Sequence, residues 1–177
     1  MKRLLILLTL FVLSASVAAA QTGVTRENVD GITNLARVGT TVACAGAITP
    51  ESVAGIRDMG FKAIINLRLE SEEGANISEE AAAARSAGIR FVHLPFGGAS
   101  LDPAVADQFL EAITEPETEP AFIHCAGGGR AATMWFIKRV VVDGWERDRA
   151  LAEAMDLGLS SGRLEDYAIA YLDARGE

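Results

Sequence analysis

The chain has 177 residues, of which half are hydrophobic, and it carries 16 Lys and Arg against 24 Asp and Glu, a net charge of −8. This length suits one domain with a full hydrophobic core. The acidic balance argues against nucleic acid as a partner, since surfaces that bind DNA or RNA are basic, and it means that an anionic ligand would need a local positive pocket.

The first residues have the order of regions that is typical of a secretory signal peptide. A charged start is followed by the apolar run Leu4–Val12 and by the small residues Val17–Ala20. The apolar run is shorter than the roughly 20 residues that a membrane span needs. We therefore expect a signal peptide over residues 1–20, one domain over residues 21–177, a periplasmic or secreted location, and no membrane span after cleavage.

Strand and helix patterns alternate along the remaining chain. Apolar or β-branched runs predict strands, and these runs are Asn34–Val38, Thr40–Ala45, Phe61–Arg68, Ile89–Pro95 and Ala121–His124. Helices are predicted from Pro50 to Gly60 and over Glu79–Ala87 (with Ser78 as N-cap), Ala104–Thr114, Ala131–Val142, Glu146–Leu157 and Arg163–Ala174. The expected fold is a single α/β domain with a central, mostly parallel sheet of about four to five strands and helices on both faces. Such sheets bind ligands at the carboxyl ends of their strands.

One stretch places a cysteine, three glycines and an arginine where a strand meets a helix. His124–Arg130 reads His-Cys-Ala-Gly-Gly-Gly-Arg. Glycines let the backbone turn sharply and aim successive N–H groups inward, and the following helix adds its positive end. In such a pocket the pKa of the Cys125 thiol should fall below its usual value of about 8.5, which favours a thiolate nucleophile. Arg130 offers a planar fork that matches two oxygens of a phosphate-like group.

This cysteine loop is therefore predicted to be an anion site at the carboxyl end of a strand. The backbone groups expected to bind the substrate belong to Ala126, Gly127, Gly128 and Gly129. The two histidines, His93 and His124, and the scattered carboxylates show no metal-ligand spacing, so we expect neither a metal nor another cofactor.

The loop resembles the His-Cys…Arg signature of the cysteine-dependent phosphatases, protein-tyrosine and dual-specificity enzymes alike. Further stretches resemble the bacterial dual-specificity-phosphatase-like domains that are also found fused to beta-lactamase-like hydrolases: Ala45–Thr49, Met59–Arg68, Ala87–Pro95 and Asp143–Trp145. The resemblance implies that Cys125 attacks phosphorus to form a phosphocysteine, that Arg130 grips the substrate oxygens, and that His124 helps to keep the thiol ionised. It implies that residues 21–177 form a phosphatase-like domain that hydrolyses phosphate monoesters, whose phosphorylated substrate the sequence does not identify. With the expected signal peptide, this hydrolase would be exported.

Two departures from the phosphatase pattern leave other functions open. Four residues separate Cys125 from Arg130, whereas most of these phosphatases have five, and the shorter loop also occurs in rhodanese-like sulfurtransferases, which carry a persulfide on the cysteine. Ala131 stands where many relatives have Ser or Thr, whose hydroxyl stabilises the departing thiolate. A sulfurtransferase and a catalytically weak, phosphate-binding pseudophosphatase are therefore the alternatives.

The general acid is the largest gap in the pattern. Phosphatases of this class commonly place an aspartate just after the strand that here ends in Pro95, but this chain has Gly97 and Gly98. Asp102 is the nearest carboxylate. It is a candidate acid, and because Pro103 follows, it also has the pattern of a helix N-cap.

Four further residues or segments near the loop are interpreted as supporting or structural. Arg68, at the end of another strand, is expected to assist anion binding, and Glu70–Glu73 is interpreted as a solvated acidic loop. His124 is either a helper of the thiol or a hydrogen-bonded core residue. Cys44 is either a small buried apolar residue or the partner of Cys125 in a reversible disulfide, which the sequence alone does not decide.

Overall fold

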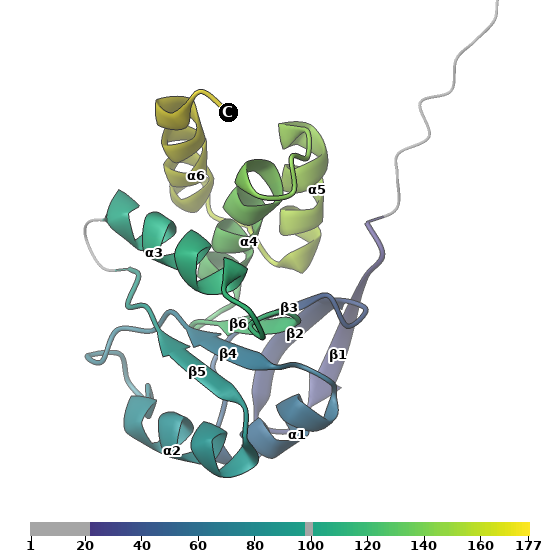
Figure 1. The fold of residues 1–177 in the computed structure, drawn as a ribbon, viewed down its shortest axis with the longest axis vertical. Coiled ribbons are helices and arrows are strands. Elements are labelled where there is room, and N and C mark those ends of the chain that lie inside the picture. The colour runs from purple at the N-terminus through teal and green to yellow at the C-terminus, as the bar shows by residue number, and fades with distance from the viewer. Residues whose placement is uncertain (1–21, 98–100) are drawn as a thin grey trace, which may run out of the picture.

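The structure is a computed structural model that describes residues 22–97 and 101–177, so the predicted signal peptide lies outside the described residues. At its centre is a six-stranded sheet in the order β1-β2-β3-β6-β4-β5 (Figure 1). The strands are β1 (Val24–Val29), β2 (Ile32–Val38), β3 (Val42–Ala45), β4 (Ala63–Asn66), β5 (Arg90–His93) and β6 (Ala121–His124). Strands β3, β6, β4 and β5 run parallel, which brings their carboxyl ends to one edge.

The predicted α/β class is confirmed, and the sheet is wider than the four to five strands expected. The extra strand is β1, which forms an antiparallel hairpin with β2, and β2 in turn pairs antiparallel with β3. Strand β1 lies at the edge of the sheet and has no fully buried position, and its sequence, Val24–Val29, accordingly contains few apolar residues. Its pattern therefore lacks the continuous apolar run that marks a central parallel strand.

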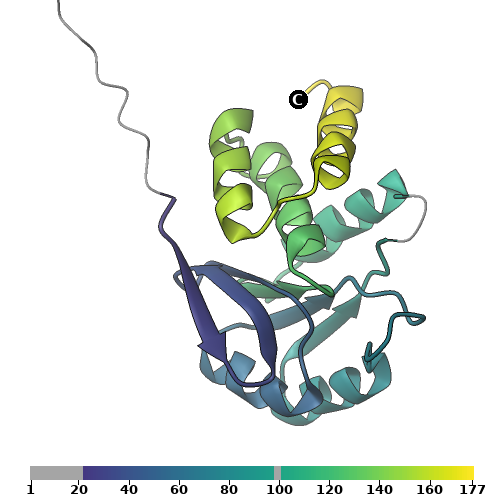
Figure 2. The same ribbon diagram turned by 180° about the vertical axis from the view of Figure 1, so that it is seen from behind.

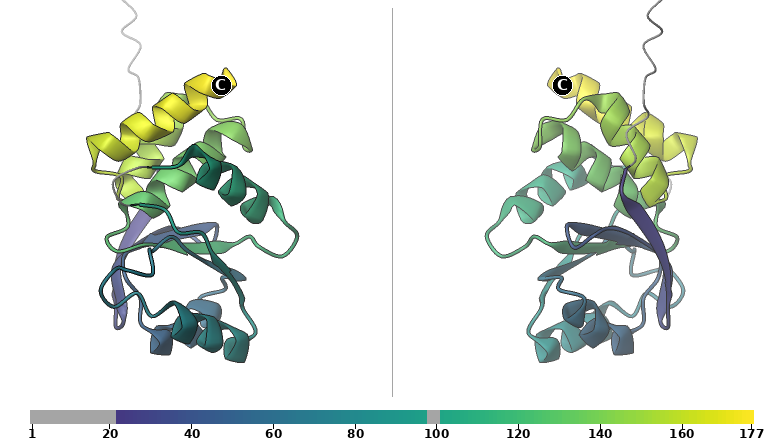
Figure 3. Two further views of the ribbon diagram at one scale, coloured as in Figure 1. Left: turned by 90° about the vertical axis from the view of Figure 1, so that its left-hand side faces the viewer. Right: turned by 90° about the vertical axis from the view of Figure 1, so that its right-hand side faces the viewer.

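Helices cover both faces of the sheet, as predicted (Figures 2 and 3). One face carries the short helices η1 (Pro50–Ser52) and α1 (Val53–Asp58) together with α2 (Ile77–Ala87). The other face carries α3 (Pro103–Thr114), α4 (Gly129–Val141), α5 (Arg147–Leu157) and α6 (Gly162–Arg175). Helix α4 is the centre of this second layer, since nearly all of its residues are buried and α3, α5 and α6 pack against it. No helix in the two described ranges is long and apolar enough to cross a membrane.

Side-chain alternation along β6 divides the core in two. Ile123 points into the cluster beneath α4, whereas Phe122 packs into the cluster beneath α1 and α2. The same alternation sends Cys125 to the α4 side, and His124 lies on the α2 side, 6.4 Å from the Phe122 ring between ring centres. The two neighbours in the sequence therefore face opposite layers.

Two helix starts illustrate how local chemistry sets the elements. Asp102 caps α3 by accepting a 2.9 Å hydrogen bond from the Ala104 N–H, as its position before Pro103 predicted. Ser78 as N-cap of α2 is wrong, because the helix begins at Ile77 after Asn76, whose φ of 47° is left-handed. Asparagine is among the few residues other than glycine that adopt this conformation readily.

Candidate active site

The cysteine loop joins the end of β6 to the first turn of α4. Cys125 is buried, with 1% of its surface exposed, and its sulfur accepts a 3.1 Å hydrogen bond from the Gly128 N–H. Gly128 has a φ of 106°, a conformation that residues with a Cβ rarely adopt, and this turn allows the N–H to point at the sulfur. The sulfur of the predicted nucleophile therefore has a backbone N–H as its hydrogen-bond donor.

The outer side of the loop is held by two segments that are distant in the sequence. The Ala126 carbonyl accepts a 3.0 Å bond from the Ala47 N–H, and the Gly127 carbonyl accepts a 3.2 Å bond from Asn34 Nδ2. A Cβ on Gly46 would lie 2.8 Å from the Ala126 oxygen, so the close approach requires glycine there. With their carbonyls bound on the outside, these peptides are free to present N–H groups to the inside. Asn34 and Gly46 are supporting residues that the sequence reasoning missed.

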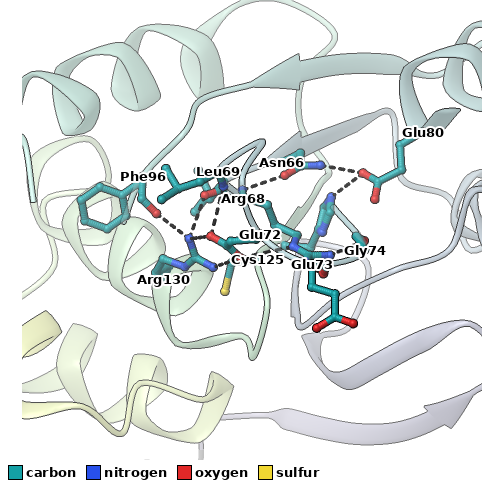
Figure 4. Close-up of polar contacts among 12 residues, drawn as sticks. Asn66, Arg68, Leu69, Glu72, Glu73, Gly74, Glu80, Phe96, Cys125 and Arg130 are labelled. Atoms are coloured by element: carbon teal, nitrogen blue, oxygen red, sulfur yellow. Dashed lines mark hydrogen bonds and ion pairs between the residues drawn. The ribbon is translucent and has the colours of Figure 1, made fainter. Parts of the chain in front are cut away.

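Arg130 is clamped by Glu72, whose carboxylate the sequence reasoning treated as solvated. Nη1 and Nη2 of Arg130 donate to the two Glu72 oxygens at 2.6 and 2.8 Å, the bidentate geometry of a strong ion pair (Figure 4). Nη1 also donates to the carbonyls of Phe96 at 2.7 Å and Leu67 at 3.2 Å. A Cβ on Gly97 would lie 2.8 Å from Nη1, so glycine at this place makes room for the guanidinium.

The clamp changes the acid–base properties of both partners. Burial by itself raises the pKa of Glu72, but the hydrogen bonds from Arg130 and the Leu69 N–H outweigh it and lower that pKa to about 2. For Arg130, burial by itself lowers the pKa, and the Glu72 carboxylate and the nearby Cys125 sulfur raise it above its ordinary value. The pair is therefore charged at neutral pH, with the guanidinium beside the nucleophile.

Arg68 is buried and binds the loop that presents Glu72. Its guanidinium donates to the carbonyls of Glu73 and Gly74, each at 2.6 Å, and to a Glu72 oxygen at 3.3 Å. These contacts turn Arg68 toward the loop and make it a positioning residue for Glu72 in this structure. Its direct contact with a substrate stays a prediction. The interpretation of Glu70–Glu73 as solvated is wrong for Glu72, because 21% of its side chain is exposed and both oxygens are bound.

Behind the loop, a fully buried polar cluster occupies the α2 face of the sheet. Glu80 of α2 accepts a 2.6 Å bond from Asn66 Nδ2, and its Oε2 lies 3.1 Å from Nε2 of His124. The Asn66 side-chain oxygen in turn accepts a 2.7 Å bond from the Arg68 N–H (Figure 4). His124 therefore pairs with Glu80 on the far side of the sheet from the Cys125 sulfur. Its assistance to the thiol stays a prediction, and Glu80 is a partner that sequence reasoning missed.

Asp102 and Thr133 both make hydrogen bonds to the backbone of the helices that they begin or belong to. The N-cap interpretation of Asp102 is confirmed, while its role as general acid stays a prediction, and Gly98 lies outside the described residues. The Thr133 hydroxyl, on the same helix as Ala131, donates to the Gly129 carbonyl at 2.8 Å.

Cys44 lies on β3 in register with Ile123, two positions before Cys125 on the neighbouring strand, and both cysteines are buried in the cluster beneath α4. Both thiols are free. Burial raises the pKa of the Cys44 thiol well above its ordinary value, with smaller contributions from the charges of Cys125 and Glu153. A reversible disulfide between the two cysteines stays a prediction. Within residues 22–97 and 101–177, no three His, Cys, Asp or Glu side chains converge as metal ligands.

Known proteins with a similar sequence or a similar fold are phosphatases or contain phosphatase-like domains. The family model described as DSP-PTPase phosphatase fused to NAD+ kinase matches residues 20–170. A beta-lactamase hydrolase-like protein of Xylella fastidiosa is 32% identical over 134 residues, which cover 72% of this chain and 31% of that protein. The dual specificity protein phosphatase TpbA of Pseudomonas aeruginosa is 28% identical over 150 residues, which cover 81% of this chain and 65% of TpbA. The chain thus spans about a third of the hydrolase-like relative.

Solved structures show the same architecture. The crystal structure of P. aeruginosa TpbA aligns with a TM-score of 0.61 and 25% identity, covering 86% of this chain and 89% of that one. The structure of Tk-PTP in its active form aligns with a TM-score of 0.65 and 19% identity, covering 82% and 98% of the two chains. With a family model that matches most of the chain and a cysteine loop in the geometry just described, the chain belongs to the DSP-PTPase phosphatase family of cysteine-dependent phosphatases.

Proposed function

We propose that the chain is an exported phosphatase that hydrolyses phosphate monoesters through a phosphocysteine intermediate. The observation that carries the proposal is the placement of Arg130, which Glu72 holds by two hydrogen bonds beside a cysteine whose sulfur accepts a loop N–H. The hydrogen bonds to Glu72, Phe96 and Leu67 use Nη1 and one N–H of Nη2. Nε and the other N–H of Nη2 can then serve substrate oxygens, together with the loop amides.

These positions support a reaction in two steps. The thiolate of Cys125 attacks phosphorus, the S–P bond forms, and the ester P–O bond breaks with the electron pair going to the leaving oxygen. Water then attacks phosphorus, the S–P bond breaks, and inorganic phosphate and the thiolate are released. One carboxylate oxygen of Asp102 is bound in the cap of α3, and the sequence has no other candidate for the general acid between β5 and α3. Leaving groups that depart without a proton, such as phenols, are therefore favoured. Because Ala131 has no hydroxyl, the second step is expected to be the slower one.

An aryl phosphate is accordingly the first substrate class to test. One relative, TpbA, has been crystallised as a complex with phosphotyrosine, at 24% identity and a TM-score of 0.61 to this chain. Phosphotyrosine carries a phenolic leaving group, which suits a site without an evident acid. Export rests on the pattern of residues 1–20.

The test is hydrolysis of para-nitrophenyl phosphate by the chain without residues 1–20, under reducing conditions, beside the variants Cys125→Ser and Arg130→Ala. We expect vanadate-sensitive phosphate release that is lost in Cys125→Ser and falls about a hundredfold or more in Arg130→Ala. Thiosulfate-to-cyanide transfer is measured in parallel. Thiocyanate without phosphate release would assign the site to sulfur transfer, and phosphate binding with neither product would assign it to a pseudophosphatase, the alternative that the capping role of Asp102 favours.

A further inference from the structure

Phe96, whose backbone binds Arg130, is itself packed against helix α6. The Phe96 carbonyl accepts the 2.7 Å hydrogen bond from Nη1 of Arg130 (Figure 4), and the Phe96 N–H donates to the Leu67 carbonyl at 3.1 Å. The Phe96 ring is 1% exposed, and its centre lies 4.9 Å from the centre of the Tyr167 ring of α6. This distance is in the range of aromatic pairs that attract one another. A shift of the Phe96 ring would therefore move the carbonyl that binds the guanidinium.

The hydroxyl of the same tyrosine binds the other end of the connection between β5 and α3. Oη of Tyr167 donates to the Asp102 carbonyl at 3.1 Å. Burial raises the pKa of Tyr167 above its ordinary value, and neighbouring acidic side chains add to the rise, so the hydroxyl keeps its proton and remains a donor. Between the two contacted residues lie Gly97 and Leu101, which line a cavity of about 310 Å³ together with Arg130. Tyr167 thus contacts this connection on both sides of the part that borders the site.

Helix α6 is in close contact with the helix that carries Arg130. It packs against α4, and Leu164 and Tyr167, three positions apart, share one face of α6. A Cβ on Gly129, in the first turn of α4, would lie 3.3 Å from Cδ1 of Leu164, so this face closely approaches the start of α4. Tyr167 and Arg130 therefore belong to two helices that are packed together, and Phe96 contacts both side chains.

We propose that Tyr167 is a positioning residue for Arg130. Its ring holds Phe96, whose carbonyl binds Nη1 of the guanidinium, while Glu72 binds Nη1 and Nη2 through its carboxylate. Its hydroxyl holds the Asp102 carbonyl, which fixes the far end of the same connection. This role rests on the proposed phosphatase function, in which Arg130 binds the phosphoryl oxygens.

The test is the affinity for inorganic phosphate, titrated by calorimetry into the Cys125→Ser protein, alone and combined with changes at Tyr167. Tyr167→Leu removes the ring and the hydroxyl, and we expect it to weaken phosphate binding about tenfold, the lower end of the range for one hydrogen bond to a charged group. Tyr167→Phe keeps the ring, so its affinity should stay within about threefold of the Cys125→Ser protein. Tyr167→Met takes the place of Tyr167→Leu if that variant does not fold.

Tyr171 is the matched control, because it lies one turn further along α6 and also binds α3. Its hydroxyl donates to Oδ1 of Asp107 at 2.7 Å, whereas the contacts to Phe96 and to the Asp102 carbonyl belong to Tyr167. Tyr171→Leu should therefore lower stability in urea and leave the phosphate affinity unchanged. Equal weakening of phosphate binding by Tyr171→Leu and Tyr167→Leu would assign the effect to general packing of α6 and overturn the inference.

A second comparison tests whether Tyr167 acts through Arg130. In Arg130→Lys the side chain keeps its charge but lacks the planar fork that Phe96 and Glu72 hold. Adding Tyr167→Leu to Arg130→Lys should then cost much less phosphate affinity than it does with the arginine present, because the two changes remove the same contact. A full tenfold loss in both backgrounds would contradict a route through Arg130.

The protein with Cys125 intact supplies the kinetic counterpart. KM for para-nitrophenyl phosphate should rise about tenfold in Tyr167→Leu and stay constant in Tyr171→Leu, because a smaller folded fraction lowers the apparent kcat and leaves KM unchanged. The phosphate affinities decide the role of Tyr167 even if para-nitrophenyl phosphate is not hydrolysed, in which case the phosphatase proposal alone fails. A Cys125→Ser protein that binds no phosphate would overturn the inference, since Arg130 would then hold no anion.

Discussion

The two faces of the sheet contribute to the site in different ways. On the α4 face, Cys125 lies among apolar side chains, and its direct polar support comes from the backbone of its own loop. On the α2 face, the buried side chains of Asn66, Glu80 and His124 contact one another and reach the Arg68 backbone. The sheet thus separates the Cys125 sulfur from the Asn66, Glu80 and His124 side chains, and the carboxyl ends of β4 and β6 connect the two. This difference predicts that changes on the far face alter catalysis through Arg130 and leave the thiol in place.

Glu72→Gln should cause the largest loss, because it removes the charge that orients Arg130 while keeping the shape of the side chain. Misplacement of a substrate-holding group by about 1 Å can cost about a hundredfold in rate, and we expect a fall of that size in kcat/KM for para-nitrophenyl phosphate. Glu73→Gln is the control, since only the backbone carbonyl of Glu73 takes part in the network. Equal activity of Glu72→Gln and wild type would show that the clamp has no part in catalysis.

The same clamp predicts how stability depends on pH. The pKa of Glu72 is about 2 in the folded protein and near 4.3 in an unfolded chain, so the clamp stabilises the fold fully above about pH 5. Its contribution disappears as pH falls toward 2. The unfolding free energy, measured in urea, should therefore fall more steeply between about pH 5 and pH 2 for wild type than for Glu72→Gln. Parallel curves for the two proteins would contradict the assignment.

Glu80→Ala tests the far face directly. The substitution leaves the buried Asn66 Nδ2 without its acceptor, and an unsatisfied buried donor typically costs roughly 1–3 kcal/mol, so a loss of this size is expected in urea unfolding. Glu80 also fixes the Asn66 side chain, whose oxygen accepts the hydrogen bond from the Arg68 N–H. Without Glu80 the Arg68 segment is held less firmly, so we expect KM for aryl phosphates to rise about tenfold at temperatures where the protein is folded. Alkylation of Cys125 by iodoacetamide should be little changed. Glu79→Ala, at the exposed neighbouring position, should alter neither quantity, and a changed alkylation rate in Glu80→Ala alone would contradict the separation of the two faces.

Gly97→Ala tests the space that Arg130 occupies. The added methyl group would lie 2.8 Å from Nη1 and must displace the guanidinium or the segment itself. We expect KM to rise about tenfold, with a smaller change in stability than Glu80→Ala causes. Gly74→Ala is a useful comparison, since its Cβ would meet no neighbouring atom within 4 Å although its φ is also positive. A larger KM effect from Gly74→Ala would show that backbone strain, and not the lost space, controls the site.

Asn34→Ala should have the smallest effect of the series. It removes the hydrogen bond to the Gly127 carbonyl, and a single such bond is worth about 1 kcal/mol, or roughly a fivefold change in kcat/KM. The backbone at Asn34 has a φ of 50°, so Asn34→Gly relieves strain while also removing the side chain. Equal activities of the two variants would assign the effect to the lost hydrogen bond, whereas recovery in Asn34→Gly would assign it to the backbone.

The fold and the centre of the site could be predicted from the sequence because their signals are local. The apolar strand that ends at His124, the three glycines and Arg130 lie within a dozen residues, and each has a direct conformational or chemical meaning. The same holds for Asp102 before Pro103, which caps its helix as expected. Even the opposite orientation of His124 and Cys125 follows from strand alternation and could have been inferred.

The missed residues depend on contacts between distant parts of the chain. Glu72 is 58 positions from Arg130, and Glu80 of helix α2 reaches His124 at the end of strand β6. In the sequence, Glu72 is one of several acidic residues in a polar loop, and Glu80 is one of two adjacent glutamates at the start of an alanine-rich helix. Only the path of the chain decides which member of each set is buried. A local signal existed for Glu72 alone, since it lies four positions after Arg68 and a buried arginine needs a partner.

The hairpin at the edge of the sheet has a consequence for how this domain can be joined to others. Strand β2 supplies Asn34 to the cysteine loop, and the Thr33 N–H and carbonyl bond the Ala47 and Gly46 backbone. A fragment that begins after this hairpin would still contain every residue of the cysteine loop and yet lack the outer wall of that loop. A version of the domain that is shortened or fused at its N-terminal side must therefore have its junction before Val24. Strands β1 and β2 then stay in the same protein as Cys125.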